Sequence, residues 1–116
     1  MLWTRDLRDR ISTGILALGD ALYLGAGEGE VYRLNQTTGV VEARLIVAGA
    51  TFGPPIPVGD SLIVLAGERS MICIDRTLSA VRWRQGLLDG LSSSRPYVWR
   101  GTVLAGTEKG ELLAFR

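Results

Sequence analysis

The sequence predicts an all-β protein built from three copies of one unit. Apolar stretches about one strand long alternate with turns rich in glycine and acidic residues, which is the pattern of an antiparallel meander. No stretch shows sustained helical periodicity with capping residues. The pattern also repeats, because Trp3, Ala43 and Trp83 follow one another at intervals of 40 residues.

The composition excludes several functional classes. The chain has 116 residues, 47% of them hydrophobic, and a net charge of +1, so it has one domain's worth of core and no bulk attraction for nucleic acid. It contains no histidine, which excludes histidine-based nucleophilic triads and histidine metal sites. The single cysteine, Cys73, lies in an apolar run and is expected to be a small buried hydrophobe. No run is long enough to span a membrane, and no signal peptide is apparent, so the default expectation is a cytoplasmic protein.

The first copy contains the clearest strand and turn signals. Gly19 and Asp20 form a turn between two apolar stretches, and a Gly-Glu-Gly turn follows at residues 27–29. A short strand carrying Trp3 is expected at the start of the chain, before a charged stretch at residues 5–10. The strands expected in this part are residues 1–5, 14–18, 21–26, 30–35 and 40–46.

The second and third copies follow the same plan. Gly59 and Asp60 repeat the first turn, and the proline-rich stretch at residues 49–57 is expected at the inner edge of a sheet or in an entry loop. A polar loop of three serines then leads into the third copy. The strands expected here are residues 61–66, 70–75, 80–85, 95–99, 102–106 and 111–116.

Three units of about 40 residues, each with about four strands, match the size of a β-propeller blade. The sequence therefore predicts a single repeat domain over residues 1–116, with three blades of four antiparallel strands and about 12 strands in all. The blades are expected at about residues 5–46, 47–85 and 86–116, with residues 1–5 supplying a strand that closes a blade. Such a chain would form half of a six-bladed ring or part of a larger propeller.

The repeat resembles that of the pyrroloquinoline-quinone-type propellers. Residues 31–39 read Val-Tyr-Arg-Leu-Asn-Gln-Thr-Thr-Gly, and the family's tryptophan position four residues later is occupied by Ala43. In the second copy Ser79 replaces the glycine but Trp83 is present, and the third copy retains Leu-Leu-Ala-Phe-Arg at residues 112–116. The family includes quinoprotein dehydrogenases and a non-catalytic outer-membrane assembly lipoprotein.

The resemblance implies which residues hold the blades together. Trp3 and Trp83 are expected to dock between neighbouring blades, with the indole N–H reaching a backbone carbonyl. Gly39 and Asp75 are the structural members of the motif turns. A ligand-stacking role for the tryptophans is the alternative, and Trp99, which lies outside the motif position, is the aromatic residue to check first for exposure.

Three blades cannot close a ring, because known propellers have at least about four. One solution is a homodimer with six blades, in which residues 1–4 pair beside residues 111–115 of the partner subunit. The other is that the chain belongs to a longer propeller. The closed homodimer is the favoured expectation.

The function expected is that of a non-catalytic propeller module for protein interaction or scaffolding, with no cofactor, metal or nucleic-acid partner. One alternative is a small-ligand site in the long loops, where Ser93 and Arg95, together with Trp99, are the candidate contacts. The other is a fragment of a quinone-dependent dehydrogenase. That enzyme class needs clustered calcium ligands and a carboxylate base, and the sequence shows no such cluster.

Overall fold

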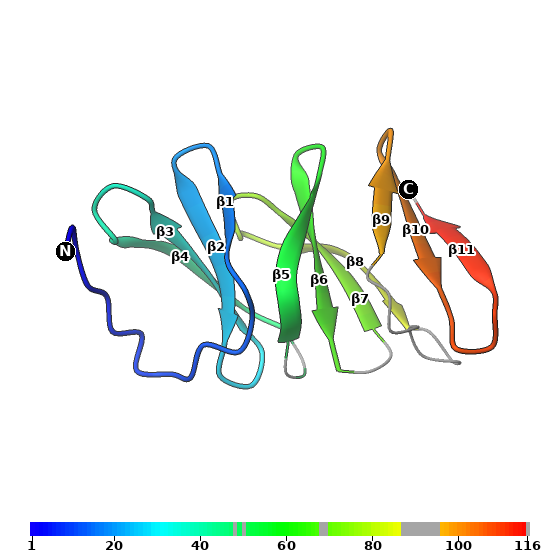
Figure 1. Ribbon diagram of the computed structural model, residues 1–116, viewed down its shortest axis with the longest axis horizontal. Helices are drawn as coiled ribbons and strands as arrows, with labels where there is room; N and C mark the ends of the chain where they lie inside the picture. The colour runs from blue at the N-terminus through cyan, green and yellow to red at the C-terminus, as the bar shows by residue number, and fades with distance from the viewer. Residues whose placement is uncertain (48, 50, 68–69, 87–95, 116) are drawn as a thin grey trace.

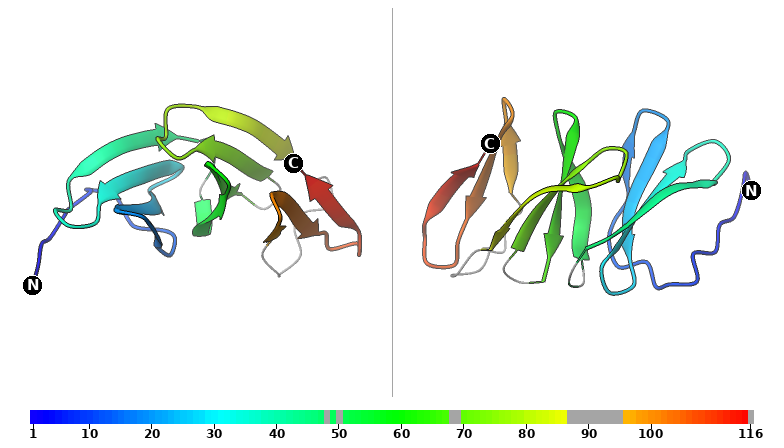
Figure 2. Two further views of the ribbon diagram at one scale, coloured as in Figure 1. Left: turned by 90° about the horizontal axis from the view of Figure 1, so that it is seen from above. Right: turned by 180° about the vertical axis from the view of Figure 1, so that it is seen from behind.

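The computed structural model describes the whole chain except residues 48, 50, 68–69, 87–95 and 116 (Figure 1). The described residues form eleven strands in three antiparallel sheets and no helix, which confirms the predicted all-β class. The sheets lie side by side along the chain and fan into an arc when seen from above (Figure 2). Ser93 and Arg95, two of the candidate loop contacts, lie outside the described residues.

The first sheet has the order β1-β2-β3-β4 and forms the first blade. Two-residue and glycine-containing turns connect its strands, and Gly19 adopts the positive φ of +62° that such a hairpin turn requires. The register of the third strand with the fourth shifts between Arg33 and Leu34, which leaves Glu42 as an extra residue on the fourth strand. The strands are β1 (Leu16–Leu18), β2 (Ala21–Ala26), β3 (Glu30–Asn35) and β4 (Val41–Ile46).

The second sheet repeats this order with β5-β6-β7-β8. The proline-rich stretch is its edge strand, pairing only with β6, because proline cannot donate to a ladder on both sides. Its register with β6 shifts between Phe52 and Ile56, across two of the prolines. The strands are β5 (Thr51–Val58), β6 (Ser61–Ala66), β7 (Ser70–Asp75) and β8 (Val81–Gly86).

The third sheet has three described strands, in the order β11-β10-β9, and so lacks the outer fourth strand of the other two. They are β9 (Tyr97–Trp99), β10 (Thr102–Gly106) and β11 (Leu112–Phe115). Residues 1–5 were expected to be a strand closing a blade, but they form none here. Within one chain they lie at the opposite end of the arc from β11, so they do not pair with its free edge (Figure 1).

The core is divided between the faces of the sheets. The first seam, between the first and second sheets, buries a cluster that includes Tyr23, Val31 and Ile74. The second seam, between the second and third sheets, buries Met71 and Val103 among others. The free face of the first sheet is covered by Trp3 and other residues of the N-terminal segment. Since each sheet is apolar on both faces, the blades hold together by stacking.

Candidate protein interface

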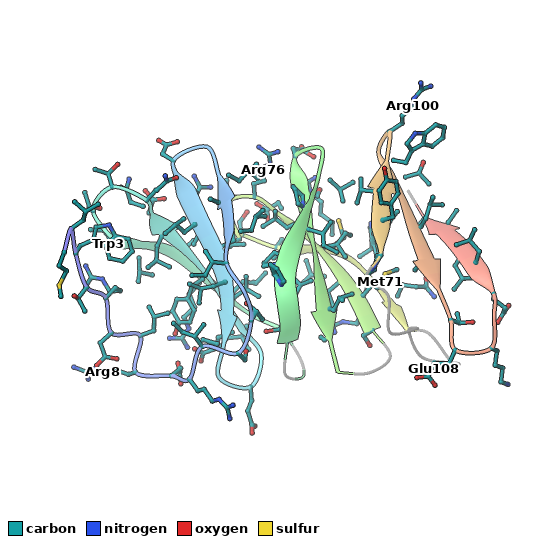
Figure 3. The ribbon with its side chains drawn as sticks, viewed as in Figure 1. Trp3, Arg8, Met71, Arg76, Arg100 and Glu108 are labelled. Carbon is teal, nitrogen blue, oxygen red and sulfur yellow. The ribbon has the colours of Figure 1, made fainter. Side chains whose placement is uncertain are left out.

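Trp3 lies directly on Gly39, in the turn between β3 and β4. Gly39 has a φ of +73°, and a Cβ atom at this position would collide with the indole ring. The indole Nε1 donates a hydrogen bond of 3.1 Å to the carbonyl oxygen of Gln36, and Arg5 Nε donates to the Gly39 carbonyl oxygen at 2.7 Å. The structure therefore brings together two of the residues singled out in the sequence, and Figure 3 shows Trp3 at the N-terminal end of the arc.

Trp83 lies in β8, opposite Cys73 of β7, and is half buried in the second seam. Its ring stacks on Phe115 of β11, with 6.1 Å between the ring centroids and 28° between the planes. The contact joins the outer strand of the second sheet to the last described strand of the third. Trp83 thus contacts the following blade, as Trp3 contacts the first.

The first seam has no tryptophan, because Ala43 occupies the matching register position opposite Arg33. Leu78, in the turn after β7, is only 4% exposed and lies in the same apolar cluster that Ala43 packs against. Leu78 reaches this position from a backbone φ of +59°, which a bulky residue adopts at an energetic cost. A larger residue on the second blade therefore compensates for the smaller one on the first.

Two side chains of the first blade donate to one carbonyl oxygen of the second. Tyr23 Oη donates to the Arg76 carbonyl oxygen at 2.7 Å, and Arg33 Nη1 donates to the same oxygen at 2.9 Å. Arg76 lies 40 residues after Gln36, whose carbonyl oxygen accepts from Trp3. Sequence reasoning missed the roles of Tyr23 and Arg33. The available signal was the paired loss of the motif tryptophan at Ala43 and the motif glycine at Ser79.

Asp75 organises the turn that follows β7. Its carboxylate accepts hydrogen bonds from the Ser79 and Ala80 amides at 3.0 and 2.8 Å, from the Ser79 hydroxyl at 2.7 Å and from the Thr77 hydroxyl. Burial alone would raise the pKa of this carboxyl group, but the hydrogen bonds outweigh burial and hold the pKa well below its usual range. In the first blade Asn35 has the matching role and accepts from the Thr37 and Thr38 amides.

The third sheet presents an apolar face that points away from the second seam. Leu112 on this face is 74% exposed, whereas Val31 and Met71, at the same register position of the first and second blades, are fully buried. Met71 lies within the second seam in Figure 3. Tyr97 and Trp99 lie on the same free face and are 65% and 55% exposed. Together with the edge of β11, with which no described strand pairs, this trailing face is the candidate interface.

The described residues offer little for catalysis or metal binding. Among them, no group of three acidic, cysteine or histidine side chains is placed to hold a metal ion. An open depression is lined by Arg10, Ile11 and Ser12 together with Gly27 and Glu28. Within the same described part, no helix is long and apolar enough to cross a bilayer.

Comparison with known proteins identifies relatives of one kind. The chain is 27% identical, over 94% of its length, to the outer membrane protein assembly factor BamB of Moranella endobia (strain PCIT). It is 26% identical, over 97% of its length, to the factor of the same name from Yersinia pestis. It covers 32% and 33% of these relatives, so it spans about a third of their length.

A solved structure supports the fold. The crystal structure of BamB from Moraxella catarrhalis superimposes with a TM-score of 0.80 and 23% sequence identity. The match covers 97% of this chain and 35% of that one. At this level of identity the likeness establishes the propeller fold, as predicted from the repeat.

The expectation of a cytoplasmic protein is wrong. It depended only on the lack of a visible signal peptide or membrane span, whereas the curated relatives are assembly factors of outer membrane proteins. The family described as outer membrane protein assembly factor BamB matches over residues 1–116, and its repeat is of the pyrroloquinoline-quinone type expected from the motifs. The chain therefore belongs to the BamB family of β-propeller proteins.

Proposed function

We propose that the chain is a non-catalytic propeller scaffold that binds other proteins during the assembly of outer membrane proteins. The family relationship supports this role, since both curated relatives carry the name of an assembly factor. The chain covers only about a third of the length of those relatives. Their role in assembly is therefore assigned to this chain as a proposal. The trailing face of the third sheet is the observation that carries the proposal.

Exposed apolar area next to an unpaired strand edge is typical of association surfaces. The equivalent faces of the first two blades are covered by the next blade, and the residues matching Leu112 are fully buried there. The trailing face therefore has the shape and composition of a surface that receives another β-sheet.

The finer proposal is that a second copy of the chain covers this face and completes a six-bladed ring. Trp3 already lies on Gly39 in the manner in which a preceding blade would dock its tryptophan. Trp83 shows that an outer strand can pair with its own sheet and still contact the next blade. Residues 1–5 can therefore stay docked on their own first blade and pair along the β11 edge of the partner subunit.

Light scattering on a sizing column tests ring completion. The unmodified chain is expected at twice the single-chain mass of 12.5 kDa. Leu112→Asp places a charge on the trailing face without removing a buried side chain, and it is expected to give the single-chain mass. The matched control Ile46→Asp changes an exposed apolar strand residue on β4 and is expected to leave the dimer intact. A single-chain mass for the unmodified protein would disprove the homodimer.

Scaffolding is tested separately by biolayer interferometry. The folded chain is immobilised and exposed to purified outer membrane protein assembly factors from Yersinia pestis and to a urea-unfolded outer membrane protein. Saturable binding to at least one of them is the expected result. If the folded chain binds none of these proteins, the scaffolding role is wrong, whatever its mass in solution.

A further inference from the structure

Three hairpin turns, β1–β2, β5–β6 and β9–β10, lie along the same side of the arc (Figure 1). The first two turns are Gly19-Asp20 and Gly59-Asp60, and the third is Arg100-Gly101. The strand pairings put these turns in register, since Leu18 pairs with Ala21, Val58 with Ser61 and Trp99 with Thr102. The third blade thus has Trp-Arg where the second has Val-Gly.

Arg100 occupies this turn against the local preference of the backbone. Its φ is +49°, in the region that Gly19 and Gly59 adopt at +62° and +57° and that side-chain-bearing residues rarely enter. Among the described residues its guanidinium group makes no ion pair and lies over the Trp99 ring. A strained backbone conformation that no stabilising contact offsets is common at functional positions.

The contact between Arg100 and Trp99 sets the direction in which the Arg100 guanidinium group points. The Arg100 guanidinium carbon lies 4.9 Å from the centroid of the Trp99 ring, which is a cation–π distance. A guanidinium group held over an indole keeps its N–H groups available to a carboxylate, in a bidentate geometry that arginine favours. Figure 3 shows Arg100 at the outer end of the hairpin, projecting away from the sheets.

Ring completion would leave this turn open. Gly19 and Gly59 border the first and second seams, yet a Cβ atom at either would meet no atom within 4 Å. The matching position of Arg100 is therefore expected to stay accessible when another blade or copy covers the trailing face. Trp99 matches Leu18 and Val58, which pack in the first and second seams. The indole therefore belongs both to this site and to the interface proposed above, so a covering copy is expected to compete with a partner segment for Trp99 while Arg100 stays exposed.

We propose that Trp99 and Arg100 form a recognition site for an acidic segment of a partner protein, in which an Asp or Glu lies beside an apolar side chain. This inference rests on the scaffolding role proposed above and assigns it a contact point. Charge complementarity selects the carboxylate, and the exposed indole provides the apolar surface next to it. An anionic lipid surface is disfavoured, because it would extend over the two neighbouring turns as well, where Asp20 and Asp60 would repel it. A single carboxylate of a peptide needs to contact only the turn of Arg100.

The test begins with a random peptide library displayed on phage and selected on the intact chain. The enriched peptides are expected to contain Asp or Glu within two residues of an aromatic or aliphatic side chain. The binding of a selected synthetic peptide is then measured by fluorescence anisotropy for Arg100→Gly and Trp99→Val. These two changes give the third hairpin the residues of the second, so the fold is preserved. Each is expected to weaken binding about tenfold or more.

Arg8→Gly is the matched control. Arg8 is also an exposed arginine at positive φ, +62°, so the change removes the same charge and the same backbone strain elsewhere. Both glycine variants are expected to raise the melting temperature slightly, because glycine adopts positive φ without strain. Only Arg100→Gly should weaken the binding of the peptide. The site would be disproved if Arg100→Gly bound the peptide fully or if the enriched peptides lacked carboxylates. Binding to assembly factors in the earlier assay would still support the scaffolding role in that case. The proposed protein site would also be overturned if the chain bound phosphatidylglycerol vesicles and Arg100→Gly abolished that binding. Arg100 would then be a lipid contact.

Discussion

The molecule contains two versions of one blade joint. One is the contact of Trp3 with the first blade, and the other is the first seam, between the first and second blades. In the first, a tryptophan packs on a glycine and its indole N–H donates to the carbonyl oxygen of Gln36. In the second, an alanine faces a turn that carries Leu78 inward, and Tyr23 and Arg33 donate to the carbonyl oxygen of Arg76. The apolar filling and the donor both differ, and the acceptor is a carbonyl at the same position of the turn.

The comparison shows what the joint requires. Close packing needs a fixed total volume across the seam, so tryptophan with glycine can be exchanged for alanine with leucine. The turn carbonyl receives a donor in both joints, since an acceptor that packing shields from water is costly to leave unpaired, but the donor can come from a different strand. Motif residues at a blade joint are therefore one solution among several that satisfy the same two conditions.

Removing the filling side chain of the first seam should have the largest effect. Leu78→Ala takes a 4% exposed side chain out of the cluster and is expected to lower the free energy of unfolding by about 2–4 kcal/mol, measured by urea denaturation. Thr38, at the matching position of the first blade, is exposed, so Thr38→Ala should cost less than about 0.5 kcal/mol. Equal costs for the two variants would show that Leu78 does not fill the seam.

Gly39→Ala tests the tryptophan version of the joint. The added Cβ collides with the Trp3 ring and is forced into positive φ, so a loss of about 2–3 kcal/mol is expected. Gly59→Ala is the control, because Gly59 has a φ of +57° and no neighbour within 4 Å, and it should show only the backbone cost of about 1 kcal/mol. The indole N–H resonance of Trp3 should shift in the first variant alone. If both variants lose the same amount, the packing of Trp3 on Gly39 contributes nothing.

Tyr23→Phe tests the replacement donor. It removes the hydroxyl that donates to the Arg76 carbonyl oxygen and should cost about 1 kcal/mol. Because Arg33 donates to the same oxygen, the cost should rise when Arg33 is changed to Met, which a double-mutant cycle measures. Strictly additive losses would mean that the two donors do not share the acceptor. Tyr97→Phe, at an exposed position, provides the control.

The smallest effect concerns pH. The pKa of Asp75 is lowered in the folded chain by its hydrogen bonds to Ser79, Thr77 and Ala80, despite the opposing effect of burial. Its contribution to stability is therefore present above the unfolded-state pKa of about 3.9 and is lost as the pH falls further. Asp75→Asn should be slightly less stable than the parent at pH 7, and the difference should shrink on acidification in urea titrations. A difference that does not change with pH would contradict this role of the carboxylate.

Most of the fold could be predicted because turn residues and apolar strands recur with a fixed period. The repeat located the strand pairs correctly, including the edge position of the strand with three prolines. The conformation of residues 1–5 could not be predicted, because it depends on whether a strand lies within reach rather than on local sequence. The roles of Tyr23 and Leu78 were hidden because the motif at that seam was incomplete, and a missing residue does not indicate which neighbour replaces it. Trp99 was singled out as an aromatic residue outside the motif, but its partner Arg100 becomes apparent only from the backbone angle of the turn.

The most direct test of the two-joint account is the stability of a chain whose first seam is converted to the tryptophan version. Urea denaturation is measured for Ala43→Trp alone and for the triple variant Ala43→Trp, Leu78→Thr and Ser79→Gly. If Leu78 and Ser79 occupy the space that an indole would need, the single change is destabilising by about 1–3 kcal/mol, and the triple variant recovers most of the loss. If Ala43→Trp alone is as stable as the parent or more stable, the seam is underfilled and the proposed exchange of volumes is wrong.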